Sequence, residues 1–215
     1  MLYSELQCSP AIHQAVERMG FAEMTEIQEK TIPVMMAGHD VIAKAPTGTG
    51  KTIVFASVAA DQVRAGDRVL ILAHRGELLE QAADKLQRST GLVSAVEKAE
   101  STCLNSWFRV VVGSVQTLQR PARLERFPRD YFGTIIIDEA HHAITDGYRR
   151  ILDYFEGAKV LGVTATPDRG DMRNLGEVFD SLAYEYKLTD AIKEGYLCTV
   201  SYTHLRAHET CADLV

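Results

Sequence analysis

The stretch APTGTGKT, residues 45–52, lies between two apolar runs, residues 41–43 and 53–56. A strand, a glycine-containing loop and a helix in that order let successive backbone N–H groups point at a phosphate, and the helix N-terminus adds positive potential. Lys51 is predicted to reach the β- and γ-phosphates of a nucleotide, and the Thr52 hydroxyl to hold Mg²⁺. A turn that only caps a helix is the alternative interpretation. The predicted nucleotide-binding residues of this stretch are Thr47, Gly48, Thr49, Gly50, Lys51 and Thr52.

The composition is that of an ordinary globular protein, with 215 residues, 46% of them hydrophobic and 24% charged. This length allows one large domain, or one domain with an appendage. No apolar run is long enough to span a bilayer, and the first residues lack the pattern of a secretory signal, so no membrane partner is expected. Four scattered cysteines without a CxxC pair fit a reducing compartment, and we expect a cytoplasmic location. The net charge of −6 gives no global attraction to nucleic acid, although a local basic stripe is sufficient for binding.

From residue 40 onward, apolar runs alternate with helical stretches. The runs are continuous rather than alternating, which is typical of strands buried on both faces of a parallel sheet. The sequence therefore predicts an α/β fold, in which helices cover both faces of a mostly parallel sheet and ligands bind at the carboxyl ends of the strands. The predicted strands cover residues 40–45, 68–73, 109–113, 133–138 and 158–163, and the predicted helices residues 51–65, 75–88, 114–119 and 146–155.

Residues 1–39 are predicted to form a helical segment before the first strand. The pair Ser9-Pro10 starts one helix, and Gly20 ends it. Thr25 can cap a second helix, which Pro33 is expected to kink or interrupt.

Two acidic residues, Asp138 and Glu139, follow the apolar run at residues 135–137. A carboxylate at the end of a buried strand can hold Mg²⁺ beside the phosphates, and the next acid can orient or deprotonate an attacking water. An acidic helix N-terminus, which the helix dipole favours, is the alternative interpretation. Because a Gly-Lys-Thr loop precedes these acids in the same α/β pattern, we predict that Lys51, Asp138 and Glu139 are catalytic.

Residues 138–141, with the sequence DEAH, resemble motif II of the superfamily 2 helicases. Residues 45–52 resemble motif I of that superfamily, in which alanine at the first position is common, and residues 73–78 resemble motif Ia. Residues 112–117 resemble the next nucleic-acid-contacting motif, and residues 164–167 resemble motif III. The five motifs occur in the family's order, each after a predicted strand, and the resemblance extends to about Thr199.

This resemblance implies a RecA-like ATP-binding domain, the first of two in an ATP-dependent helicase or translocase that uses ATP and Mg²⁺. The chain is most like the bacterial Ssl2/RadD-type DEAD/DEAH helicases, and the same segments resemble motor subunits of type I and type III restriction enzymes. A non-catalytic nucleotide-binding module is the alternative from another class. The resemblance implies a second RecA-like domain that supplies transition-state arginines. Without it, we expect the chain to bind ATP weakly and to hydrolyse it negligibly.

The resemblance also assigns roles to polar residues at other strand ends. His141 is expected to contact the γ-phosphate region or motif III, and Thr164 and Thr166 to link hydrolysis to domain motion. DNA or RNA is the implied partner, with DNA favoured. For each residue alone, a helix cap or a solvated loop is an equal alternative. The predicted nucleic-acid-binding residues are His74, Arg75, Ser114, Gln116 and Thr117.

Residues 20–28 resemble the Q motif that precedes motif I in DEAD-box proteins, with Met24 and Glu26 in place of the usual proline pair. The resemblance implies that the Gln28 amide contacts the adenine edge and that Tyr3 is a stacking aromatic residue. A helix cap with a surface glutamine is the alternative interpretation.

Arginines recur at every third position after the predicted helix at residues 114–119. Such a spaced basic segment can contact a nucleic-acid backbone, and a solvated face is the alternative interpretation. The segment comprises Arg120, Arg123, Arg126 and Arg129.

The last residues, 200–215, differ in character from the rest and resemble translated sequencing-adapter read-through. His204, His208 and Cys211 have a spacing that suggests zinc, but three candidate ligands without a fourth make a poor structural site. We therefore expect a helical segment over residues 1–39, a RecA-like domain over residues 40–199 and a non-native tail.

Overall fold

The computed structural model describes residues 23–37, 40–44, 51–74, 76–164, 175–179 and 181–185. The first predicted helix, the loop at residues 45–50, Arg75, Thr166 and the tail lie outside these ranges, so their predictions stay predictions.

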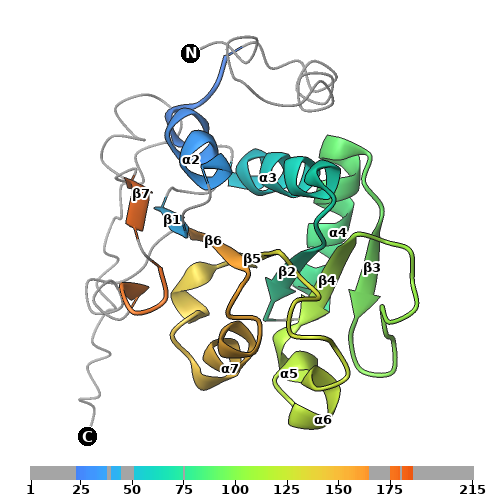
Figure 1. The fold of residues 1–215 in the computed structure, drawn as a ribbon. Coiled ribbons are helices and arrows are strands. Elements are labelled where there is room, and N and C mark those ends of the chain that lie inside the picture. The colour runs from blue at the N-terminus through green and yellow to red at the C-terminus, as the bar shows by residue number, and fades with distance from the viewer. Residues whose placement is uncertain are drawn as a thin grey trace, which may run out of the picture.

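The described strands form one seven-stranded sheet in the order β3-β4-β2-β5-β6-β1-β7 (Figure 1). Every neighbouring pair in this order is parallel. All five predicted strands are present, and the predicted α/β fold is confirmed. The strands are β1 (Val41–Lys44), β2 (Val69–Ala73), β3 (Ser94–Glu97), β4 (Val110–Ser114), β5 (Thr134–Asp138), β6 (Lys159–Thr164) and β7 (Ser181–Glu185).

Side chains of the central strands alternate between the two faces of the sheet, as the pleat requires. In β2, Val69 and Ile71 join one hydrophobic cluster, whereas Leu70 and Leu72 join a second cluster on the other face. All four are at most 1% exposed. Burial on both faces explains why the sequence shows an unbroken apolar run here rather than an alternating one.

Helices cover both faces of this sheet (Figure 1). No helix within the described ranges is long and apolar enough to cross a membrane. The first face carries α2 (Glu26–Met36), α3 (Lys51–Ala65) and α4 (Gly76–Thr90), and the second carries α5 (Val115–Leu118), α6 (Pro121–Leu124), the 3-10 turn η2 (Ala140–His142) and α7 (Asp146–Tyr154).

Helix α2 continues through Pro33 to Met36, so the proline does not interrupt the helix, and the predicted kink stays a prediction. A proline inside a helix costs about 3 kcal/mol, because one backbone hydrogen bond is lost and the ring meets the preceding turn. Ile27, Ile32 and Met35 are at most 1% exposed and pack in the same hydrophobic cluster as α3. Each such burial contributes about 1.5–3 kcal/mol, so together they outweigh the proline.

Four short elements were not predicted from the sequence: β3, α6, η2 and β7. Strand β3 has four residues and lies at one edge of the described sheet, with Val96 36% exposed. An edge strand that is only partly covered needs no apolar run, so periodicity does not reveal it.

Candidate functional site

The carboxyl ends of the parallel strands form one row, which we call the carboxyl edge. In spatial order it comprises the ends of β4, β2, β5, β6 and β1, at Ser114, Ala73, Asp138, Thr164 and Lys44. The segments singled out in the sequence therefore lie side by side, although long stretches of chain separate them. This is the edge at which ligands of open parallel sheets bind.

Strand β1 ends at Lys44 on the carboxyl edge, and helix α3 begins at Lys51. The 15-residue helix presents its N-terminus here, where unpaired N–H groups and the helix dipole favour an anion. The side chains of Lys51 and Thr52 are not described, so their predicted phosphate and Mg²⁺ contacts stay predictions.

Asp138 is the last residue of β5, and Glu139 occupies the turn directly after it. Asp138 Oδ1 accepts a hydrogen bond from the backbone N–H of Glu139 at 3.0 Å. Glu139 has φ 55° and ψ 54°, a left-handed conformation that costs a non-glycine residue roughly 1–2 kcal/mol. The Glu139 side chain is 40% exposed and so accessible to a water or ligand. Strain of this kind persists where the surroundings impose it, and it clusters at functional sites.

His141 connects the acidic turn to the next strand. Its Nδ1 lies 3.1 Å from Thr164 Oγ1 and 3.4 Å from Glu139 Oε2. Thr164 is fully buried and is the last residue of β6. The histidine therefore lies between a half-exposed carboxylate and a buried hydroxyl, and any movement of β6's end changes its contacts.

Gly162 allows η2 to lie directly on β6. A Cβ at this position would be 2.5 Å from Phe179 Cζ and 2.8 Å from Ala140 Cβ, both closer than van der Waals contact permits. Because η2 carries His141, the missing side chain of Gly162 determines how near His141 comes to Thr164.

His74 follows β2 and is exposed. Its ring stacks on that of His142, with centroids 5.1 Å apart and an interplanar angle of 25°. The His142 ring lies 4.1 Å from that of His141. The sequence assigns no role to His142, and its contact with His74 depends on β2 and β5 being neighbours in the sheet.

The other predicted nucleic-acid contacts differ in exposure. Gln116 is exposed, whereas Ser114 and Thr117 are 6% and 9% exposed. Thr117 Oγ1 accepts a hydrogen bond from the Ala99 backbone N–H at 3.0 Å, so it holds the turn after β3 against α5. The surface available to a partner at α5 is therefore provided by Gln116 rather than by the two hydroxyls.

Gln28 is 1% exposed, and its Oε1 accepts a hydrogen bond from the Thr25 backbone N–H at 2.9 Å. This is a helix-capping contact, as in the alternative interpretation, although the glutamine is buried rather than on the surface. Its predicted contact with adenine stays a prediction.

A buried ion pair was missed by sequence analysis. Glu97, the last residue of β3, is fully buried and accepts a hydrogen bond from Arg123 Nε. Its other carboxylate oxygen accepts from the Cys103 N–H at 2.7 Å. Burial, with Glu97 nearby, raises the pKa of the Cys103 thiol from 9.0 to about 12. Arg123 is thus an internal partner of Glu97 and not part of a solvated basic stripe. Nothing in the local sequence pattern indicates this pairing.

Tyr148 on α7 is fully buried, and among the described residues its hydroxyl has no hydrogen-bond partner. Burial raises its pKa, and the charges of Asp138 and Glu139 raise it further.

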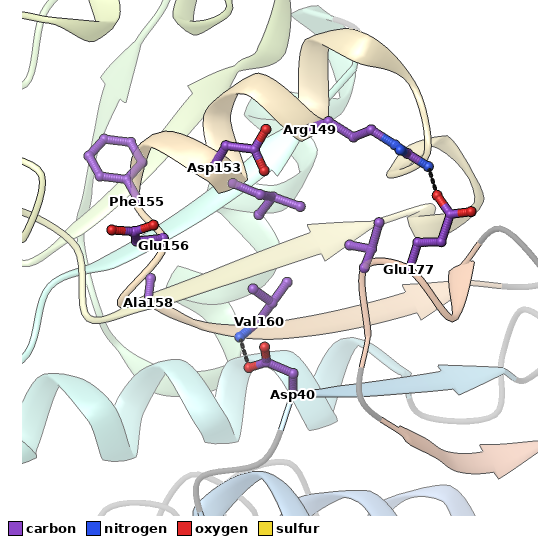
Figure 2. A pocket seen from close by; sticks show the side chains of 10 residues that line it. Asp40, Arg149, Asp153, Phe155, Glu156, Ala158, Val160 and Glu177 are labelled. Carbon is purple, nitrogen blue, oxygen red and sulfur yellow. Dashed lines mark hydrogen bonds and ion pairs between the residues drawn. The ribbon is translucent and has the colours of Figure 1, made fainter.

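A pocket of about 420 Å³ lies elsewhere, along α7 and the amino ends of β1 and β6 (Figure 2). Figure 2 shows the Asp40 carboxylate bonded to the Val160 N–H and Arg149 paired with Glu177. None of the predicted site residues lines it. Within the part of the chain that the structure describes, no group of three or more His, Cys, Asp or Glu side chains could hold a metal ion.

A parallel sheet with a helix N-terminus, paired acids and a histidine–threonine contact at its carboxyl edge agrees with the RecA-like, ATP-binding domain that the resemblance to superfamily 2 helicases predicts. The chain belongs to the family described as "Type III restriction enzyme, res subunit", whose model matches residues 12–169.

The chain is also similar to curated relatives, and its fold is similar to those of solved structures. The chain is 34% identical over 182 residues to "Putative ATP-dependent helicase IRC3" of Saccharomyces cerevisiae, covering 78% of this chain and 26% of that protein. It is 28% identical over 197 residues to the DEAD-box ATP-dependent RNA helicase CshC of Bacillus cereus, covering 86% and 48%. The fold is similar to that of S. cerevisiae Dbp5 bound to RNA and ADP BeF3, with a TM-score of 0.74, 20% identity and coverage of 87% and 52%. It is also similar to a DEAD box protein from the hyperthermophile Methanococcus jannaschii, with a TM-score of 0.73, 23% identity and coverage of 86% and 55%. The chain thus spans about a quarter to a half of the length of these two curated relatives.

Proposed function

We propose that this chain is the first RecA-like half of an ATP-driven motor that moves along single-stranded nucleic acid, of the Ssl2/RadD type. The observation that carries the proposal is the position of His141 Nδ1 between Glu139 Oε2 and Thr164 Oγ1. This contact joins the acidic turn to the end of the neighbouring strand. A motor needs a contact of this kind, which transmits the structural change caused by ATP hydrolysis from the nucleotide site to the rest of the protein.

The chemistry proposed is phosphoryl transfer from ATP to water. Lys51 and the N-terminus of α3 bind the phosphates, and Glu139 takes the proton of the attacking water, a role worth about 10²- to 10⁴-fold in rate. Asp138 and Thr52 offer the carboxylate and hydroxyl oxygens that Mg²⁺ prefers, so these two residues would hold it. Bound there, Mg²⁺ neutralises charge on the phosphates. Gln28 contacts adenine in this proposal.

Two partners complete the proposed motor. A second RecA-like half supplies arginines that stabilise the transition state, which can be worth on the order of a thousandfold or more. The nucleic acid binds near His74, Arg75 and Gln116. The names of CshC and of the Dbp5 complex mention RNA. These names do not support the preference for DNA that was expected from the sequence. The binding experiment below therefore uses both DNA and RNA.

The nucleotide site is tested by titrating the 215-residue chain with mant-ATP and Mg²⁺. We expect weak binding that Lys51→Ala abolishes and that Lys159→Ala, a matched change at the opposite edge of the sheet, leaves unchanged. Binding that survives Lys51→Ala contradicts the site. Robust ATP turnover by the chain alone, stimulated by nucleic acid, contradicts the need for a second half.

The polymer is tested by fluorescence anisotropy with labelled oligo-dT and oligo-rU at low and moderate salt. We expect binding that weakens as salt rises, because phosphate contacts release counterions. The tighter oligonucleotide identifies the preferred strand. Absence of binding to both contradicts the nucleic-acid part of the proposal.

The matched family description also supports a second candidate, the motor subunit of a restriction endonuclease. Its chemistry at the carboxyl edge is the same. A nuclease domain encoded in the same protein or in a partner subunit distinguishes it from a helicase.

A further inference from the structure

Three imidazole rings run across the carboxyl edge from the exposed side to the acidic turn. His74 stacks on His142 at 5.1 Å, and His142 lies 4.1 Å from His141. His141 Nδ1 in turn contacts Thr164 Oγ1 at 3.1 Å. We call His74, His142 and His141 the imidazole row. It joins β2, the turn after β5 and β6 by side-chain contacts alone.

The middle of the row is held by its backbone. The His142 N–H donates to the Glu139 carbonyl oxygen at 3.0 Å, and the Thr145 hydroxyl donates to the His142 carbonyl oxygen at 2.9 Å. Ala140 and Ala143, on either side of the two histidines, are fully buried. These contacts fix the backbone of the turn. When one ring of the row moves, the turn therefore does not move with it, and the contact with the neighbouring ring changes.

The two ends of the row differ in what they face. His74 is exposed beside the segment proposed to contact nucleic acid. The His141 side chain is 30% exposed and lies 3.4 Å from Glu139 Oε2, the group proposed to accept the proton of the attacking water. His142 is the contact between these ends, and the proposed chemistry gives it no task.

We propose that His142 is a positioning residue that couples strand binding at His74 to the contacts of His141 with Glu139 and Thr164. This inference rests on the proposed function, because it assumes that nucleic acid binds at His74. When the strand displaces the His74 ring, the stacked His142 ring follows, and His141 changes its position between the carboxylate and the hydroxyl.

The test is an NMR titration of the histidine-labelled 215-residue chain with oligo-rU and oligo-dT at one fixed pH. The ring signals are assigned by single substitutions. In the unsubstituted chain we expect the His74 and His141 signals to shift together on binding. In His142→Ala we expect the His74 shift to persist and the His141 shift to fall at least about threefold, because an aromatic stacking contact is removed.

Two further variants separate coupling from simple packing. His142→Phe keeps an aromatic ring, so we expect it to retain most of the His141 shift. Trp107→Ala removes an 84% exposed aromatic side chain from the connection before β4, and we expect it to change nothing at His141. A full His141 shift in His142→Ala overturns the inference while leaving the proposed function intact. Absence of any shift at His74 with either oligonucleotide overturns the proposed nucleic-acid contact and the inference with it.

Discussion

The two edges of the sheet differ in the contacts that some of their polar groups make. At the amino edge, where the strands begin, polar groups bind the backbone of neighbouring segments. Asp40 Oδ1 accepts from the Val160 N–H at 2.7 Å, and the Lys159 N–H donates to the Gly133 carbonyl oxygen at 3.0 Å. At the carboxyl edge, Glu139 is strained and His141 contacts a carboxylate and a hydroxyl instead.

The volume of a pocket alone therefore does not identify a functional site. The pocket of about 420 Å³ extends to the amino edge, yet Asp40, which lines it, accepts a hydrogen bond from Val160 of the neighbouring strand. A hydrogen bond to a charged group contributes about 1.5–3 kcal/mol to stability, whereas a left-handed glutamate costs about 1–2 kcal/mol. At the amino edge, the hydrogen bond of Asp40 stabilises the fold. At the carboxyl edge, the left-handed conformation of Glu139 lowers stability but sets the arrangement of the side chains.

The comparison predicts its largest effect at Glu139. In a protein that contains both RecA-like halves, Glu139→Gln is expected to lower ATP hydrolysis about 10²- to 10⁴-fold, because the amide cannot accept the proton of the attacking water. Phosphate release measures this. Glu156→Gln, the same change in the pocket, is the control and is expected to leave the rate unchanged. Equal rates for both variants would show that the acidic turn is not the catalytic one.

The next prediction concerns Arg123 of α6, which acts structurally through Glu97 at the end of β3. Arg123→Ala leaves the fully buried Glu97 carboxylate unpaired and is expected to lower the free energy of unfolding by about 3–5 kcal/mol in urea titrations. Arg126→Ala, at an exposed position of the same segment, is expected to change it by about 0.5 kcal/mol or less. If the two variants are equally stable, the ion pair does not support the fold.

A smaller loss of stability is expected at the amino edge. Asp40→Ala removes the acceptor of the Val160 N–H, so the free energy of unfolding should fall by about 1.5–3 kcal/mol. Asp40→Asn keeps an acceptor oxygen and should recover most of that loss. Mant-ATP affinity is expected to stay the same in both. A variant that keeps its stability but loses nucleotide binding contradicts the division between the edges.

The smallest effect concerns alkaline pH. Because burial raises the pKa of Cys103 from 9.0 to about 12, the folded state holds this proton more tightly than the unfolded state. Its contribution to stability is complete below pH 9 and is lost as the pH rises toward 12, with a slope of at most about 1.4 kcal/mol per pH unit. Urea titrations between pH 8 and 10 should show a shallower decline for Cys103→Ala. An unchanged decline assigns the loss to other groups, such as Tyr131, whose pKa burial also raises.

The sequence predicted the parts of the molecule that local patterns determine. The strands β2, β4, β5 and β6 are buried on both faces, so their apolar runs are visible in the sequence. Asp138 is the last residue of β5 and Glu139 follows it directly. The parallel topology then places both acids at the carboxyl edge.

What the sequence did not reveal depends on partners that are distant along the chain. Glu97 and Arg123 are 26 residues apart and lie in different elements. His142 meets His74 only because β5 is the neighbour of β2 in the sheet. Pro33 is tolerated because tertiary burial of α2 outweighs the lost hydrogen bond. Each of these outcomes is decided by packing rather than by local periodicity.

The close packing around Gly162 limits the substitutions that this site can accept during evolution. With Phe179 and Ala140 both closer to a Cβ at position 162 than contact permits, these three positions share one small volume. A larger residue at any one of them needs a smaller one at another, or η2 moves off β6 and takes His141 with it. We expect substitutions here to be tolerated in compensating sets, so that the acidic turn is constrained by a residue that does not touch the chemistry.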